Sequence, residues 1–299
     1  MRRADLKNWA RNAMNRSYWK SVLVALIIYA IIYAVSYVAS MGMSGMSLLA
    51  GFDTTYATDD EMATFVVLML VMLGIALLFS VASFLVKIFL ANPIEVGCQR
   101  FFCVGLYQNN PSLNEIGAGF KRNYKNVIKT LFFRDLFLTL WLILAIVIAW
   151  VVILAMTVVM VLLMENVGDV AAIILAVVMF ILIYAVVIVA ELPYLVKYYE
   201  YMMIPYILAD NPDMPRKQVF ALTKQMMKGD KWNAFVLQLS FIGWDLLSVC
   251  TCGILSILYV EPYRYYTLAA FYKTMQQKVE RQMQMSNSQM PQFEQPNNF

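Results

Sequence analysis

Residues 137–163 read FLTLWLILAIVIAWVVILAMTVVMVLL, and no charged side chain interrupts them. A membrane-spanning helix needs about 20 apolar residues, so this run is long enough to cross a bilayer. Four more apolar segments occur along the chain, at approximately 21–41, 64–90, 170–190 and 234–260. The sequence therefore predicts an all-α fold, a polytopic transmembrane helical bundle.

The composition of the 299 residues supports membrane residence and narrows the chemistry. Hydrophobic residues make up 62% and charged residues only 14% of the chain, whereas soluble domains carry about a quarter charged residues. Histidine is absent, which removes the commonest general base and the commonest metal ligand. The four cysteines are too few and too scattered for a disulfide framework. The sequence also lacks a phosphate-binding loop, a dinucleotide fingerprint and a nucleophile elbow, so we expect no catalytic site, cofactor, metal or nucleic-acid partner.

The distribution of lysine and arginine decides how the last apolar segment is interpreted. Residues 250–253, CTCG, interrupt this segment, which is either one span or a hairpin of two arms. Short basic loops lie on the cytoplasmic side of membranes. With a hairpin, all 23 basic residues face the cytoplasm, whereas with a single span the last four face outward. We therefore predict both termini in the cytoplasm and six crossings, at approximately 21–41, 64–90, 137–163, 170–190, 234–249 and 253–272.

Both ends of the chain are predicted to lie outside the transmembrane domain of residues 21–272. Residues 1–20 are predicted to form a cytoplasmic amphipathic helix, and their long charged stretch argues against a cleaved signal peptide. Residues 281–299 are rich in Gln, Asn, Met, Ser and Pro and lack a core-forming pattern. We therefore predict a disordered cytoplasmic tail for 281–299.

A weak internal repeat agrees with three hairpins. Each hairpin is preceded by a basic amphipathic segment, at 6–20, 113–133 and 219–233. The first and third segments align at Trp19 and Trp232. Each returning helix ends near a proline: Pro93, Pro193 and Pro262. The pattern indicates either a duplication or convergence on a common membrane-protein pattern.

The basic amphipathic segments are predicted to be helices in the lipid headgroup layer. In the second segment, Ser112 and Glu115 fit the capping box of a helix start. Its apolar residues recur at helical spacing, and four cations lie off that stripe: Lys121, Arg122, Lys125 and Lys129. These four are candidate contacts for anionic lipid headgroups, although anchoring of the topology alone also explains their positions.

Charged residues in or beside the spans are further candidates for function, because burying a charge in a bilayer is costly. Four of them lie at the inner ends of spans, where structural anchoring explains them: Lys87, Arg134, Asp135 and Glu191. The last hairpin holds a denser group: Asp245, Glu261, Pro262 and Arg264. This group is therefore the candidate functional site of the sequence.

The meaning of this group depends on how far the last hairpin reaches. If its second arm crosses the membrane, Glu261 and Arg264 lie near mid-membrane, one helical turn apart, and can pair. Pro262 would then break the helix, as in the broken helices of transporters. If the hairpin is short and re-entrant, the same residues lie near the cytoplasmic surface. The prolines of the other two repeats favour the short hairpin.

The C-terminal third resembles a bacterial integral-membrane family catalogued as a domain of unknown function, number 975. The resemblance is carried by Met227-Lys228-Gly229, Trp232, Phe235, LSFIGW at 239–244, Leu246-Leu247, Thr251, Gly253, Pro262-Tyr263, Thr267 and Phe271-Tyr272. Two shorter stretches are also similar, Ala209-Asp210-Asn211-Pro212 and Leu6-Lys7-x-x-Ala10-Arg11. The resemblance implies a bacterial cytoplasmic membrane location. It implies no activity and therefore no functional residues.

Two functions remain open from the sequence. The first is a non-enzymatic scaffold, assembly factor or regulator that engages anionic lipid or a membrane protein partner through its basic helices. The second is a transporter or permease for an unknown solute, with its site in the last hairpin.

Overall fold

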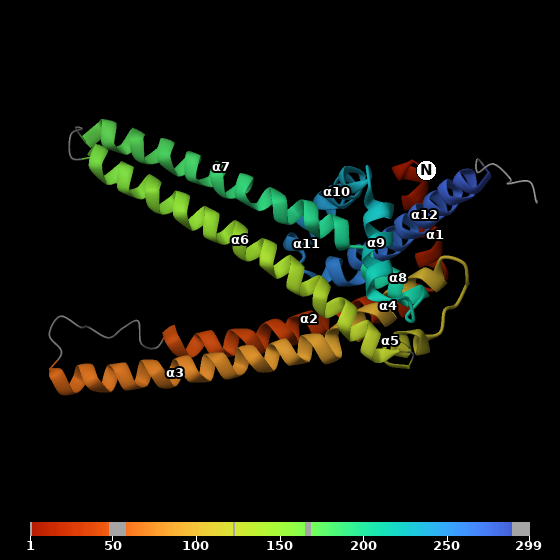
Figure 1. Ribbon diagram of the computed structural model, residues 1–299, viewed down its shortest axis with the longest axis horizontal. Helices are drawn as coiled ribbons and strands as arrows, with labels where there is room; N and C mark the ends of the chain where they lie inside the picture. The colour runs from red at the N-terminus through yellow and green to blue at the C-terminus, as the bar shows by residue number, and fades with distance from the viewer. Residues whose placement is uncertain (1, 48–57, 122, 165–168, 289–299) are drawn as a thin grey trace, which may run out of the picture.

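Two helical hairpins carry most of the apolar sequence (Figure 1). The first pairs α2 (Tyr18–Ser47) with α3 (Asp59–Val86), and the second pairs α6 (Tyr124–Met164) with α7 (Asp169–Tyr201). The two hairpins diverge from a common base, where the other helices gather. The computed structural model describes residues 2–47, 58–121, 123–164 and 169–288, and no strand occurs among them. The prediction of an all-α fold is therefore confirmed.

The helices at the base form a body that holds most of the buried core. They are α1 (Arg3–Arg16), α4 (Asn92–Gly105), α5 (Ala118–Lys121), α8 (Ile204–Asp210), α9 (Arg216–Met227), α10 (Lys231–Leu239), α11 (Ile242–Cys250) and α12 (Glu261–Ser288). Helix α12 contacts α1, α4 and α9. The largest fully buried side chains include Tyr266, Tyr272, Phe101 and Phe102, so aromatic packing between α12 and α4 forms the centre of the body.

Along the two hairpins, the apolar side chains face outward. Leu78, Leu154 and Ile173 are all exposed, as are many of their neighbours. Exposure of apolar surface to water costs about 25 cal/mol per Å², whereas lipid tails offer apolar surroundings. Among the described residues, five helical stretches are long and apolar enough to cross a membrane: Tyr18–Met41, Asp60–Gly105, Tyr124–Leu163, Ile173–Asp210 and Lys231–Cys250. The chain is a membrane protein.

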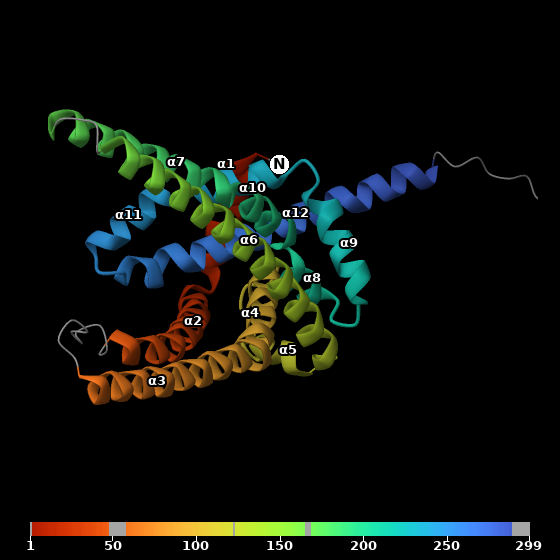
Figure 2. The same cartoon turned by 60° about the vertical axis from the view of Figure 1, so that its left-hand side comes forward.

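The last hairpin is much shorter than the other two. It turns through Cys252 and Gly253, whose φ angles are +51° and +82°, and returns through the π-helix η3 (Ser256–Val260) into α12. Figure 2 shows that it points the same way as the long hairpins but reaches less far. The predicted sixth crossing, 253–272, is not among the five stretches found in the described chain. Its second half is buried in the body, so the short re-entrant alternative fits the structure better than a complete crossing.

The predicted amphipathic helix 1–20 is divided into α1 and the start of α2. Ser17 separates the two helices with φ −139° and ψ 36°. The apolar face of α1, including Leu6, Ala10 and Met14, is buried and packs on α12. Protein therefore covers this face, where the sequence predicts contact with lipid.

The second predicted amphipathic segment, 113–133, is not a single helix. It consists of the 3₁₀ turn η2 (Leu113–Gly117), the short α5 and the first turns of α6. Asn123, at φ +46°, separates α5 from α6, which then runs without a break through the span. Ser112 caps η2 by accepting from the Asn114 backbone N–H, but Glu115 pairs with Arg100 at 2.5 Å and closes no capping box. The box was therefore predicted wrongly, because the sequence does not show that Arg100 lies beside this turn.

The predicted boundary of the C-terminal tail is also wrong. Helix α12 continues to Ser288, so residues 281–288 are helical. The regular helical spacing of Tyr272, Met275 and Val279, all buried, extends α12 well past the last hairpin. The rest of the predicted tail, 289–299, lies outside the described residues.

Two of the three repeated prolines occupy equivalent positions. The π-helices η1 (Lys87–Ala91) and η3 end two residues before Pro93 and Pro262, respectively. A proline has no N–H, so it leaves a carbonyl of the preceding turn without its helical donor. The Tyr124 hydroxyl donates to the Phe89 carbonyl oxygen at 2.7 Å, and the Tyr18 hydroxyl donates to that of Leu258 at 2.9 Å. In both cases the carbonyl belongs to the residue four positions before the proline.

The repeat therefore has a structural basis in these two copies. Each capping tyrosine comes from the amphipathic segment that opens another hairpin. Trp19 and Trp232 are likewise both exposed at the second position of their helices, α2 and α10. Pro193 differs, because it lies inside the regular helix α7.

Gly97 allows α4 to approach η2 closely. A Cβ atom at this position would lie 1.8 Å from the carbonyl oxygen of Ile116. We expect Gly97→Ala to lower the free energy of unfolding by about 1–3 kcal/mol, because two backbone segments must move apart. The matched control is Gly74→Ala in α3, where a Cβ meets nothing within 4 Å.

The free energies of unfolding of both variants are measured by adding SDS to the protein in a mild detergent. Gly74→Ala is expected to be neutral or slightly stabilising, since alanine is the better helix former. Equal stability of Gly97→Ala and the wild type would show that α4 does not lie against η2 in this way.

Candidate functional site

A cavity of about 660 Å³ lies where the two long hairpins meet the body. Its volume is in the range of small-molecule sites, roughly 300–1,000 Å³. We call it the central cavity. Its apolar wall comes mainly from α2 and α6, with Ile28, Ile31, Ile32, Val35, Leu138 and Leu142. Its polar wall includes Lys87, Asn92, Glu95, Gln99, Arg134, Asp135, Gln238 and the tyrosines 194, 198, 201, 206 and 265.

Arg134 of α6 is the centre of an ion-pair network in this cavity. Its guanidinium donates to both carboxylate oxygens of Glu95, at 3.2 and 3.0 Å, and to Asp135 at 2.9 Å. Asn92 donates to Asp135 at 3.0 Å, and the Lys87 ammonium lies 3.6 Å from the same carboxylate. Only 11% of the Arg134 side chain is exposed. Two cations therefore face two carboxylates, and the network carries no net charge.

Two polar atoms of the cavity wall have no partner among the described residues. They are the Gln99 Oε1 atom and the Tyr206 hydroxyl, and both atoms are buried. Gln99 is 6% exposed and Tyr206 is 3% exposed. A buried polar group without a hydrogen bond costs about 1–3 kcal/mol, and such groups are rare in native proteins. These two groups are therefore candidate hydrogen-bonding positions in the wall of the cavity.

The structure changes the interpretation of the charged residues at the inner ends of the spans. Lys87, Arg134 and Asp135 were each explained as separate anchors, but the structure brings all three into the central cavity. Glu191 is exposed and does not line the cavity. Lys87, Arg134 and Asp135 therefore act together, as one ion-pair network that forms part of the polar wall of the cavity.

Sequence reasoning missed Glu95, Gln99 and Tyr206. A signal was present for the first two, because Asn92, Glu95 and Gln99 recur at helical spacing along α4 and mark one polar face. Tyr206 gave no such signal among the many aromatic residues of the chain.

The predicted group in the last hairpin does come together. Arg264 pairs with Glu261, one helical turn away, at 2.9 Å, and it also pairs with Asp245 of α11. Pro262 is buried at the start of α12. Asp245, Glu261 and Arg264 are absent from the walls of the central cavity, although Tyr265 and Leu268 of the same helix contribute to it. A functional role for the group stays a prediction.

The predicted lipid-contacting residues lie around the start of α6. Lys121, Lys125 and Lys129 are exposed, and Lys125 and Lys129 are one turn apart on the same face of α6. Arg122 lies outside the described residues. Contact of these cations with anionic lipid stays a prediction.

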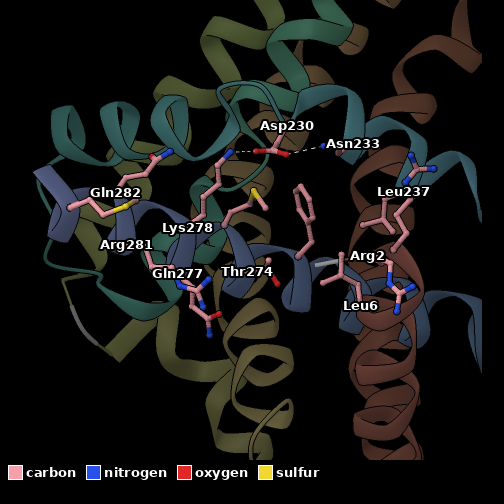
Figure 3. A pocket seen from close by; sticks show the side chains of 14 residues that line it. Arg2, Leu6, Asp230, Asn233, Leu237, Thr274, Gln277, Lys278, Arg281 and Gln282 are labelled. Carbon is pink, nitrogen blue, oxygen red and sulfur yellow. Dashed lines mark hydrogen bonds and ion pairs between the residues drawn. The ribbon is translucent and has the colours of Figure 1, made fainter.

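A second hollow, the terminal groove, lies among α1, α10 and α12 (Figure 3). It measures about 970 Å³, and Arg2, Lys278 and Arg281 contribute to its walls. Asp230 is bonded there to Lys278 and, at 2.8 Å, to Asn233. The terminal groove lacks the buried, unsatisfied groups of the central cavity among the described residues, so the central cavity is the better candidate site.

Comparison with known proteins gives a family match but no activity. The family model described as "Protein of unknown function (DUF975)" matches residues 1–279. No curated protein and no solved structure matches the chain. The match extends over both long hairpins, the body as far as residue 279 of α12, and all residues that line the central cavity.

Arg134 is expected to be the most sensitive charged residue of the cavity. Arg134→Gln leaves Glu95 without its ion pair and Asp135 with only Asn92 and the half-exposed Lys87, in a largely buried site, so we expect a loss of about 3–5 kcal/mol in unfolding free energy. Lys87→Gln is the control, because the Lys87 side chain is 47% exposed and its ion pair is worth about 1 kcal/mol or less. Similar losses for both variants in an SDS unfolding titration would contradict the central role of Arg134.

Proposed function

The chain belongs to the DUF975 family, whose description states no activity, and from its geometry we propose a non-enzymatic membrane protein that acts as a scaffold or regulator by binding a ligand in the central cavity. One observation carries this proposal. Gln99 and Tyr206 contribute unsatisfied polar atoms to the wall of a cavity that apolar residues of α2 and α6 also line. A ligand that has both a polar and an apolar part satisfies the two walls at once.

The charges of the cavity support binding over catalysis. Glu95 and Asp135 both pair with Arg134, so neither carboxylate is free to act as a general acid or base. Proton transfer needs a titratable group within hydrogen-bond reach of the reacting atom and matched to the working pH. A saturated ion-pair network instead gives a fixed polar surface, which suits recognition.

The transporter alternative has weaker support. It places a solute site in the last hairpin, around Arg264. The charge of that guanidinium is already compensated by Glu261 and Asp245, although its buried Nε has no hydrogen-bond partner among the described residues. The central cavity is lined by other residues. Transport therefore remains the second candidate, in which the molecule held by the central cavity would be the solute.

The proposed location is the bacterial cytoplasmic membrane, with the body and both termini in the cytoplasm. The ends of the described chain, at α1 and α12, both lie in the body, away from the tips of the long hairpins (Figure 1). The exposed Lys121, Lys125 and Lys129 lie at the same end, at the base of α6. Positive charge beside the membrane favours the cytoplasmic side.

Co-purification tests the proposed binding. The wild-type protein is extracted from native membranes in a detergent without a sugar head, and mass spectrometry identifies what remains bound. We expect one molecule in stoichiometric amount. The double variant Gln99→Leu/Tyr206→Phe is expected to retain it about tenfold less, because each substitution removes a hydrogen-bonding group from the cavity.

The control is the double variant Gln282→Leu/Tyr107→Phe, with Gln282 in the terminal groove and Tyr107 exposed. The control is expected to retain the molecule as the wild type does. Equal retention by the cavity variant, or loss from the control alone, would contradict binding in the central cavity.

Reporter fusions test the orientation. A fluorescent protein that matures only in the cytoplasm, fused after Phe299, is expected to fluoresce. Alkaline phosphatase, which is active only outside the cytoplasm, is expected to be active when fused after residue 47, at the far end of α2. Phosphatase activity after Phe299 would place the C-terminus outside and overturn the proposed topology.

A further inference from the structure

The charge balance of the central cavity limits which head groups it accepts. Arg134 and Lys87 are matched by Glu95 and Asp135, and each of the four charges already has an opposite charge within 3.6 Å. An anionic head group would face two carboxylates, and a cationic one would face the guanidinium and the ammonium. In a partly buried site neither added charge is compensated. The network therefore favours an uncharged head.

The unsatisfied groups indicate what that head carries. The Gln99 Oε1 atom needs a donor, and the Tyr206 hydroxyl can donate or accept. A hydroxyl group on the ligand can donate to the Gln99 oxygen and can donate to or accept from the Tyr206 hydroxyl. If the Gln99 amide is rotated by 180°, the ligand hydroxyl can instead accept from its NH₂ group. Two such positions in one cavity suit a head that carries several hydroxyls.

The tyrosines of the cavity add surfaces suited to a ring of hydroxyls. Tyr194 and Tyr198 line the cavity one helical turn apart, with ring centroids 6.4 Å apart, and Tyr265 lines it from α12. Tyrosine offers an apolar ring face beside a polar tip. A polyol such as a sugar has the same division, with C–H groups on its faces and hydroxyls at its edge.

The apolar wall extends this site toward the membrane. Ile28, Ile32 and Val35 follow one another along α2, and Leu138 and Leu142 follow along α6. Both helices continue into the exposed apolar surface of their hairpins. Acyl chains of a ligand held by its head in the cavity can therefore lie along the hairpins within the bilayer.

We propose that the central cavity binds a membrane lipid with an uncharged polyol head, of the glycosyl diacylglycerol class. The inference rests on the proposed binding function and names its ligand. The hydroxyls of the head bond to Gln99 and Tyr206, the tyrosine rings cover its faces, and the acyl chains contact α2 and α6.

Binding to defined lipids tests the inference. The full-length protein is placed in phosphatidylcholine nanodiscs, which avoids sugar detergents that compete for the site. The probes are monoglucosyl diacylglycerol, phosphatidylglycerol and soluble methyl glucoside. We expect monoglucosyl diacylglycerol to bind at least tenfold more tightly than either of the other two.

The variants locate the site. Gln99→Leu and Tyr206→Phe are each expected to weaken glucosyl lipid binding about tenfold, while Gln282→Leu in the terminal groove leaves it unchanged. Melting temperatures of the empty proteins check folding. They are expected to stay at or above the wild-type value, because the Gln99 Oε1 atom and the Tyr206 hydroxyl have no partner among the described residues.

The other outcomes separate the inference from the proposed function. Tighter binding of phosphatidylglycerol, weakened by Gln99→Leu, would overturn the uncharged head but keep the cavity as a binding site. Equal binding of methyl glucoside and the glucosyl lipid would overturn the lipid and indicate a soluble polyol. If no probe binds and the cavity variants retain the native ligand in full, both the glycosyl lipid and the proposed binding function of the cavity are overturned.

Discussion

The ion pair between Arg134 and Glu95, with the neighbouring pair between Asp135 and Lys87, joins the two halves of the molecule. Arg134 and Asp135 belong to α6 of the second long hairpin, and Glu95 belongs to α4, which continues from the first. The attraction acts in a setting with little water, where an opposite charge counts for more than at a surface. The divergence of the hairpins, the polar base of the central cavity and its neutral charge all depend on this contact.

The prolines show how the returning helices bend into the body without losing hydrogen bonds. At Pro93 and Pro262, a π-helical turn widens the backbone, and a tyrosine from another part of the chain bonds to the freed carbonyl. Unpaired carbonyl groups are costly where water is scarce. Each tyrosine also ties a returning helix to the beginning of a different hairpin, so the bends hold the hairpins together.

Much of the architecture could be predicted from the sequence, because apolar runs indicate the membrane spans and basic loops indicate their cytoplasmic ends. The four long helices of the hairpins follow from the apolar runs, and the one-turn spacing of Glu261 and Arg264 allows the pair that the structure shows. The central cavity could not be predicted in this way. Its walls combine residues as distant as Ile28 and Leu268, and charges that looked like separate anchors become one network only when α4 and α6 meet. The sequence left the length of the last hairpin open: the proline positions favoured the short form, but the burial of α12 in the body could not be predicted from its apolar character.

The length of the second hairpin has a mechanical consequence. Helix α6 has 41 residues, which at about 1.5 Å per residue gives a rod of roughly 60 Å. Its base forms part of the cavity wall, and its far end lies on the other side of the bilayer in the proposed orientation. A tilt of about 5° at the base would move the tip of such a rod by about 5 Å, close to the pitch of one helical turn. The hairpin is thus a lever arm, and an occupant that spreads or closes the base would be sensed across the membrane as a displacement of the tip.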